Sequence, residues 1–407
     1  MRQELKAINL VISFALLSAA PAFAQAQSPQ TTPEATASTV AYVYVQTLKG
    51  VNVYDAAADG KLTLVKGSPF ATTGQMVGSN GKYFISAGTD LMHVYPVESN
   101  GAIGKQVSEN NTQDYVSSAC KGGTGTASAN LDHTGQQLYV ELNLPGSCEF
   151  LQSFNIGKDS GELTYIGTTD AHNNPYPYNE GQVISFIGND KFAYVGPSPI
   201  SAFELESNGA LDAVNSFSEQ DPAPTVSDAL WSAMNVKADP TNHLAVSGFE
   251  YVPEDGSNEQ VGPFQIASYT VDASGNIATT NTLADMPTST VLPETLNMSP
   301  SGKLLAVAGT YSLNNDGFAG EAGLQVFHFN GASPITTYGK PLLTNVPIYF
   351  IHWDNNNHLY AVSDKLYVFT VTPTSTSQAP GSPYTLPALC ESSGDSCSWG
   401  LAVVPKL

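Results

Sequence analysis

The chain has 407 residues, 42% of them hydrophobic, and a formal net charge of −21 at neutral pH. This length and apolar content suffice for a large buried core. The strong negative charge excludes nucleic acid and anionic membrane surfaces as expected partners, because both require a cationic protein surface.

The first 24 residues have the pattern of a secretory signal peptide. Arg2 and Lys6 precede a short apolar run at 8–17, and Ala-Phe-Ala at 22–24 offers small residues for cleavage. The alternative, an anchoring helix, would need a longer apolar run to span a bilayer. We therefore expect an exported protein, periplasmic or extracellular, without integral membrane association.

Residues 25–39 are rich in Gln, Thr, Pro and Ser without apolar periodicity, which predicts a flexible leader. Without the signal peptide the chain has 13 Lys, no Arg and 35 acidic residues, a net charge near −22. Residues 40–407 are expected to fold as one domain and to remain monomeric.

A pattern of strand, tight turn and strand occurs six times along this domain. One copy is "PETLNMSPSGKLLAVAG" at 293–309. The turns recur every 52 to 60 residues, a spacing typical of a four-stranded propeller blade. The turn positions are Gly81, Gly135, Asp190, Asn242, Gly302 and Asn357. We expect the histidines near these turns, His133, His243 and His358, to be solvated.

A third strand of alternating apolar residues follows in each unit and occurs seven times, from "VNVYD" at 51 to "LYVFTV" at 366. The segment "WGLAVVPKL" at 399–407 starts a unit that then stops, whereas "VAYVYVQT" at 40 lacks a strand before it. These patterns predict an all-β, seven-bladed propeller of four-stranded blades, in which the C-terminal strand joins the N-terminal blade and closes the ring.

The repeat "SPSGKLLAVAG…LQVFHF", the opening "YVYVQT…GVNVYDAAADGKLTLV" and the seven units resemble the lactonase-type seven-bladed propellers, which include 6-phosphogluconolactonases and cycloisomerase-like proteins. The resemblance covers about residues 40 to 407 and implies that Glu294 stands at a family catalytic position. It also implies a His beside an Arg before an inner strand, and a second Arg after the strand that follows.

This chain departs from that family pattern. The segment "ALWSAMNVKADP" contains neither His nor Arg, and Gly309-Thr310 stands where the second Arg is implied. Without Arg the planar clamp for carboxylate or phosphate is unavailable, and Lys does not reproduce it. A phosphorylated sugar lactone is therefore not the expected substrate.

Four cysteines in an exported chain predict disulfides, with three pairings open. Cys390 and Cys397 share one predicted loop, whereas Cys120 and Cys148 lie in adjacent loops of one blade, so we expect these two pairs. A metal site is the alternative, although no CxxC pair occurs.

The long predicted connections, such as 250–263 and 387–398, open on one face of the propeller, where binding usually resides. Around the channel mouth on this face, polar and aromatic residues suit a small polar ligand such as a sugar or organic acid, and the face could also bind a glycan or protein. The alternative is that they merely plug the channel. The candidate binding residues are Gln182, Tyr349, Trp399, His172, Glu180 and Asp228.

Glu294 and His352 could act as base and acid on a neutral lactone. The alternative for His352 is a hydrogen-bonded structural role. Glycoside hydrolysis would need two carboxylates roughly 5 to 10 Å apart, for which Glu180, Asp228 and Glu294 are candidates. The acidic segments 250–260 and 314–321 could hold Ca²⁺ or be solvated loops.

The leading hypothesis is an exported propeller that binds a ligand on its long-loop face and has lost the family catalysis. An active hydrolase of a neutral lactone or sugar lactone, with Glu294 as base, is the second hypothesis. A non-catalytic surface or structural propeller is the third.

Overall fold

The structure is a computed structural model that describes residues 38–72, 74, 76–117, 126–144, 148–170, 184–196, 199–214, 218–225, 227–254, 257–310, 320–389 and 400–406. These residues belong to one compact unit, Ala37–Leu407. They form β-strands and one short 3₁₀ helix, η1 (Thr112–Tyr115). The predicted signal peptide lies outside them. In the described part of the chain, no helix has the length and apolar character needed to cross a membrane.

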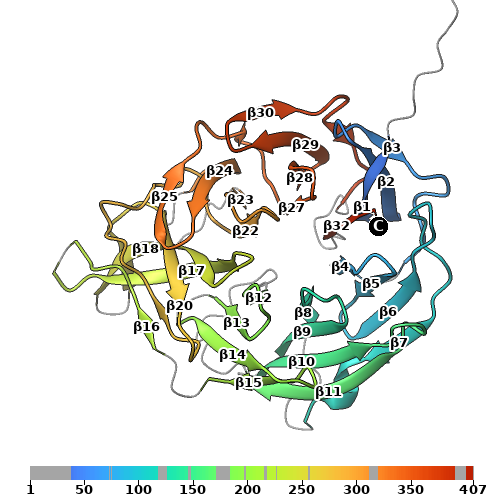
Figure 1. Cartoon of the computed structure of the whole chain (residues 1–407), viewed down its shortest axis with the longest axis horizontal. Coiled ribbons are helices and arrows are strands. Elements are labelled where there is room, and N and C mark those ends of the chain that lie inside the picture. Colours follow the sequence, from blue (N-terminus) through green and yellow to red (C-terminus); the bar gives the residue numbers. More distant parts are fainter. Residues whose placement is uncertain are drawn as a thin grey trace, which may run out of the picture. The chain divides into compact units, whose positions relative to one another are not determined.

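The strands of this unit form seven sheets around a common centre (Figure 1), which confirms the predicted seven-bladed propeller. Blade one comprises β1 (Thr39–Thr47), β2 (Gly50–Ala57), β3 (Leu62–Leu64) and β32 (Gly400–Pro405). Blade two comprises β4 (Met76–Ser79), β5 (Tyr83–Ala87), β6 (Leu91–Pro96) and β7 (Ser108–Asn111). Blade three comprises β8 (Thr126–Leu131), β9 (Gln137–Leu144), β10 (Cys148–Ile156) and β11 (Leu163–Asp170).

The remaining four blades repeat this order, and three of them carry additional short strands. Blade four comprises β12 (Ser185–Phe186), β13 (Phe192–Val195), β14 (Ser201–Leu205) and β15 (Leu211–Ala213). Blade five comprises β16 (Glu219–Gln220), β17 (Leu230–Ala238), β18 (His243–Glu254), β19 (Ser257–Gln260), β20 (Gln265–Val271) and β21 (Ile277–Ala278). Blade six comprises β22 (Thr295–Met298), β23 (Leu304–Gly309), β24 (Gly323–Asn330), β25 (Ser333–Thr337) and β26 (Leu343–Thr344). Blade seven comprises β27 (Phe350–Trp353), β28 (His358–Val362), β29 (Lys365–Thr372), β30 (Ser375–Gln378) and β31 (Tyr384–Thr385).

The second strand of blade six, β23, is buried along its whole length because both of its faces are covered. In β23, Leu304 and Ala306 pack with Leu359 of blade seven. The alternate residues Leu305 and Val307 pack with Ala245 of blade five. Successive side chains of a strand point to opposite faces, so a continuous apolar run identifies a strand buried between two neighbours.

The predicted tight turns are confirmed by their backbone. Gly81, Gly135, Asp190, Gly302 and Asn357 all have positive φ, between 53° and 87°. Glycine tolerates this left-handed region at no steric cost, and Asn and Asp tolerate it better than other residues. The turns therefore explain why these three residue types recur at the repeat interval.

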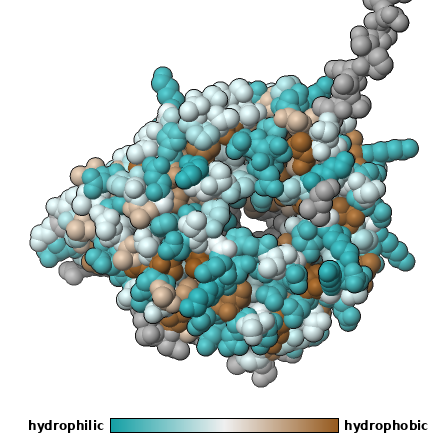
Figure 2. Space-filling view, viewed as in Figure 1, coloured by the Kyte–Doolittle hydropathy of each residue, from teal (hydrophilic) through white to brown (hydrophobic). Residues whose placement is uncertain are grey.

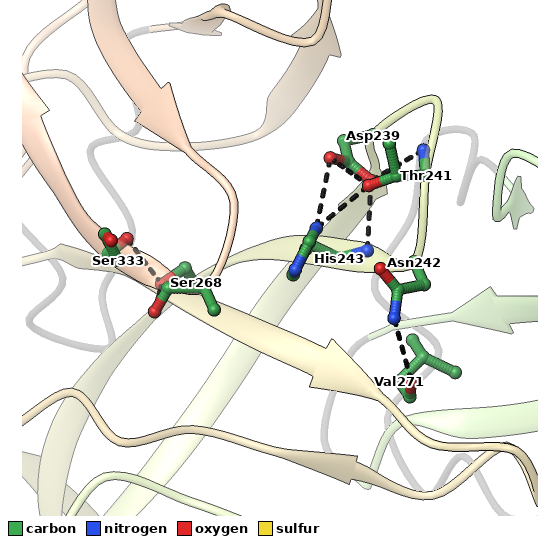
Figure 3. A network of polar contacts seen from close by, with 8 residues as sticks. Asp239, Thr241, Asn242, His243, Ser268, Val271 and Ser333 are labelled. Atoms are coloured by element: carbon green, nitrogen blue, oxygen red, sulfur yellow. Dashed lines mark hydrogen bonds and ion pairs between the residues drawn. The ribbon is translucent and has the colours of Figure 1, made fainter.

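In several blades the chain enters the tight turn through an aspartate that accepts backbone hydrogen bonds. Asp239 accepts from the backbone N–H groups of Thr241 at 2.9 Å and His243 at 3.0 Å (Figure 3). Asp354 does the same in blade seven, where the backbone N–H of His358 lies at 2.9 Å. Such a carboxylate satisfies donors that a turn would otherwise leave unpaired.

His358 is buried, with 1% of its surface exposed, so the expectation that it is solvated was wrong. Its Nδ1 donates to Asp354 at 2.7 Å, and the Tyr360 hydroxyl donates to the same oxygen at 2.9 Å. Blade one covers the ring, because a Cβ added to Gly60 would lie 3.1 Å from His358 Cδ2. By contrast, the side chain of His133 is half exposed, which agrees with the expectation that it is solvated.

Ring closure follows the prediction. Strand β32 pairs with β1 in antiparallel register from Ala41↔Pro405 to Gln46↔Gly400. The two ends of the folded domain are therefore joined within one sheet (Figure 1).

The predicted loop 250–263 is partly a hairpin. Strand β18 continues to Glu254 and pairs with β19, with Tyr251 opposite Gln260. Glu250, within the segment considered for Ca²⁺, is buried and accepts from the Thr225 backbone N–H at 2.7 Å and its hydroxyl at 2.6 Å. Among the described residues, no group of three or more His, Cys, Asp or Glu could hold a metal ion.

Glu219 and Asp221 form a pair of neighbouring carboxyl groups where β16 joins the outer edge of blade five. The Tyr269 hydroxyl donates to Asp221 at 2.9 Å, and the Ile200 backbone N–H donates to Glu219 at 3.3 Å. Burial, followed by the charge of Asp221, raises the pKa of Glu219 to about 8. Glu219 is therefore protonated in the folded protein at neutral pH.

Glu219→Gln should flatten the pH dependence of stability. The folded protein holds the Glu219 proton up to pH about 8, whereas an unfolded Glu releases it near its ordinary pKa of 4.5. The stabilising contribution is thus full below pH 4.5 and lost as pH rises toward 8. Thermal unfolding at pH 5, 6.5 and 8 should show a smaller decline for the variant. Parallel profiles for the two proteins would contradict the assignment.

Asp354→Ala should destabilise the fold by about 2–4 kcal/mol, because it leaves buried donors of His358 and Tyr360 unpaired. Ser299→Ala is the matched control, since Ser299 occupies the same turn position in blade six and accepts from the Leu304 backbone N–H at 3.0 Å. Urea unfolding should give the control a loss of only about 1 kcal/mol. Equal losses would show that the buried network adds nothing.

Candidate functional site

Glu294 lies at the start of the inner strand of blade six and is half buried. The neighbouring blade fixes its backbone, because the side-chain amide of Asn235 donates to the carbonyls of Pro293 at 2.9 Å and Glu294 at 3.1 Å. The Glu294 backbone N–H donates to the Leu292 carbonyl at 2.9 Å. The carboxylate therefore stands on a rigid segment between two blades.

Thr310 binds the Glu294 carboxylate. Its backbone N–H lies 2.5 Å and its hydroxyl 2.7 Å from Glu294 Oε2. Two donors to one oxygen favour the ionised carboxylate and hold it in one orientation.

Gly309 permits this close approach. A Cβ at position 309 would lie 2.0 Å from the Leu292 carbonyl oxygen and 3.4 Å from Glu294 Oε2. The first distance is far inside van der Waals contact, so position 309 has no room for a side chain. Where the resemblance implies the second arginine, Gly309 therefore has no room for a side chain and Thr310 binds the Glu294 carboxylate.

His352 lies on the inner strand of blade seven. Its Nδ1 donates to the Trp353 carbonyl at 2.8 Å, and the Trp353 indole donates to the Asn297 carbonyl at 3.1 Å. Burial lowers the pKa of His352, and the charge of Lys237 lowers it further. His352 and Glu294 are thus held by different neighbours, His352 by its own strand and Glu294 by Thr310.

Two of the other predicted binding residues are described. Tyr349 is half buried, packs against the core between blades seven and one, and donates its backbone N–H to Val362 at 2.9 Å. Asp228 is exposed in a turn before β17, with φ of 68°. These features do not place either side chain against the Glu294 carboxylate.

The other candidates fall outside the described residues. These are Gln182, Trp399, His172 and Glu180, together with Cys120, Cys390 and Cys397. Cys148 begins β10, where the backbone alone is described. The binding positions and the disulfides therefore stay predictions.

Sequence reasoning missed Lys237, which lies on β17 within the segment "ALWSAMNVKADP". Burial lowers its pKa to about 8. The signal was present in the repeat: Lys237, Asn297 and His352 each stand two residues before the polar residue that opens their turn, so the aligned strands place them at one level.

Comparison with known proteins bears on the fold. No protein-family model and no curated protein matches the chain. Among solved structures, a candidate 6-phosphogluconolactonase from Bacteroides fragilis matches with a TM-score of 0.55 at 12% identity, over 93% of this chain and 100% of that one. A second, from Bacteroides uniformis, matches with a TM-score of 0.53 at 12% identity, over 85% and 97%.

The chain has the lactonase-type propeller fold. At 12% identity the likeness extends to the fold alone, because one fold hosts many functions.

Thr310→Val should destabilise the protein by about 1–2 kcal/mol, because the Glu294 carboxylate loses a hydroxyl donor in a half-buried place. Thr310→Ser keeps the hydroxyl and should stay close to wild type. Urea unfolding of the three proteins tests the contact. A valine variant as stable as the serine variant would mean that the hydroxyl bond contributes nothing.

Proposed function

We propose that the protein is an exported propeller that binds a small polar ligand on its long-loop face and no longer performs lactonase chemistry. A glycan or a protein carrying such a group would use the same face. The observation that supports this proposal is the Thr310 contact, which commits the Glu294 carboxylate to a neighbour at the position where the resemblance implies an arginine.

Lactone hydrolysis passes through an intermediate with a developing oxyanion, which preorganised donors or cations must stabilise. The chain has no Arg after residue 2. Gly309 leaves no space for a longer side chain beside Glu294. The carboxylate at the channel mouth can therefore orient a ligand, whereas the arginines that would stabilise the transition state are missing from the chain.

The chemistry of the mouth favours a neutral, hydroxyl-bearing ligand. A carboxylate accepts hydrogen bonds from hydroxyl groups, and an aromatic residue would offer a flat apolar surface to a sugar ring. The predicted neighbours Gln182 and Trp399 would add an amide and a second aromatic ring. The signal-peptide pattern of the first 24 residues supports export to the periplasm or the cell exterior.

A panel of neutral monosaccharides and uncharged sugar lactones, tested with the purified protein by calorimetry, should yield saturable binding without turnover. Glu294→Gln should weaken that binding at least about tenfold, since a carboxylate hydrogen bond is worth about 1.5–3 kcal/mol. The matched control Glu206→Gln changes an exposed carboxylate in the turn between β14 and β15 and should bind normally.

Two outcomes would reject the proposal. Lactone turnover that disappears in Glu294→Gln, at unchanged melting temperature, would establish a hydrolase with Glu294 as its base. Absence of saturable binding by any member of the panel would favour a structural propeller.

A further inference from the structure

The inner strands of three successive blades place polar side chains at one level of the ring. Lys237 of β17, Asn297 of β22 and His352 of β27 each precede by two residues the polar side chain that opens the next turn. The strands β17, β22 and β27 follow one another around the centre (Figure 1). These three residues are therefore equivalent positions of the repeat.

The three side chains lie away from the cores between blades. On β17, Val236 and Ala238 on either side of Lys237 are buried in a core cluster. The residues that flank Asn297 and His352 are buried in the same way. Lys237, Asn297 and His352 themselves remain partly exposed, and Figure 2 shows an opening at the centre of the ring. Successive residues of a strand alternate, so the three side chains lie on the opposite face of each strand from these cores. From their partial exposure we infer that they face the central channel.

In the described part of the chain, the Lys237 ammonium has no hydrogen-bond or ion-pair partner. Burial lowers its pKa to about 8, so it is still mostly protonated at neutral pH. A cation removed from bulk water without a partner is unfavourable, and an anion that enters the channel would relieve this cost.

The neighbouring groups add one amide donor and one imidazole acceptor to the same space. Since His352 Nδ1 donates to the Trp353 carbonyl and burial lowers the pKa of the ring, the neutral imidazole presents Nε2 to a ligand as a hydrogen-bond acceptor. The positive charge of Lys237 lowers the pKa of His352, and the negative charge of Asp354 raises it. Strands β12, β22 and β32, which lie beside β17 and β27, contribute no charged side chain. Asn297 supplies a neutral amide donor.

We propose that Lys237, Asn297 and His352 form a site in the central channel that binds a small hydroxy acid, with its carboxylate on Lys237 and Asn297 and a hydroxyl donating to His352 Nε2. A single ammonium with one neutral amide donor matches a monovalent carboxylate. A phosphate dianion would call for more positive charge or for an arginine fork. Glu294 precedes Asn297 by three residues along the chain, so the site lies deeper in the channel than Glu294. It does not depend on the function proposed for the mouth.

Acetate and gluconate are the probes. Calorimetric titration of the full mature protein at pH 6.5 should show saturable binding of the carboxylate. A parallel titration with sodium chloride at equal ionic strength is the control. Lys237→Met should weaken this binding at least about tenfold, since a charge-assisted contact is worth about 1.5–3 kcal/mol. Binding should also weaken as pH rises through 8 to 9.5, because Lys237 loses its proton.

Lys191→Met is the matched control, because Lys191 is exposed and donates to the Ala273 carbonyl at 2.9 Å; it should bind the carboxylate normally. If Lys237→Met fails to fold, Asn297→Leu tests the same site and should also weaken binding. Binding that survives in these variants, or is matched by chloride, overturns the proposal. Glu294→Gln should leave carboxylate binding intact, which separates failure here from failure at the mouth.

Discussion

The pairing of β32 with β1 is the constraint on which the rest of the structure depends. Each blade of a propeller covers the faces of its two neighbours, so a ring with one incomplete blade would expose apolar residues and an unpaired sheet edge. Joining the ends of the domain in one sheet fixes the positions of all seven inner strands. The channel and its mouth exist only because the ring is closed.

Sequence reasoning reached the fold because the repeat carries its own physical signature. Gly81, Gly302 and Asn357 recur where the backbone needs positive φ, and apolar runs such as 304–308 recur where both faces of a strand are covered. The segment from Glu250 was an exception, because its acidic residues suggested a loop but the strands continue as a hairpin.

The site was less accessible to sequence reasoning because contacts across blades are not local in the chain. The hydrogen bond from Thr310 to Glu294 joins residues 16 apart in the chain. The hydrogen bond from Asn235 to the Glu294 carbonyl joins residues 59 apart. His358 was expected in solvent because it lies beside a tight turn, whereas a glycine of blade one covers it. Lys237 was visible only as one lysine in an inner strand, until alignment of the turns placed it level with Asn297 and His352.

Closure by the last strand also determines when the domain can complete its fold. Strand β32 comes after all other described strands in the chain, so a ribosome must synthesise the other blades before blade one can be completed. Until then the ring of blades stays open. The domain therefore reaches its full stability only once β32 has been made.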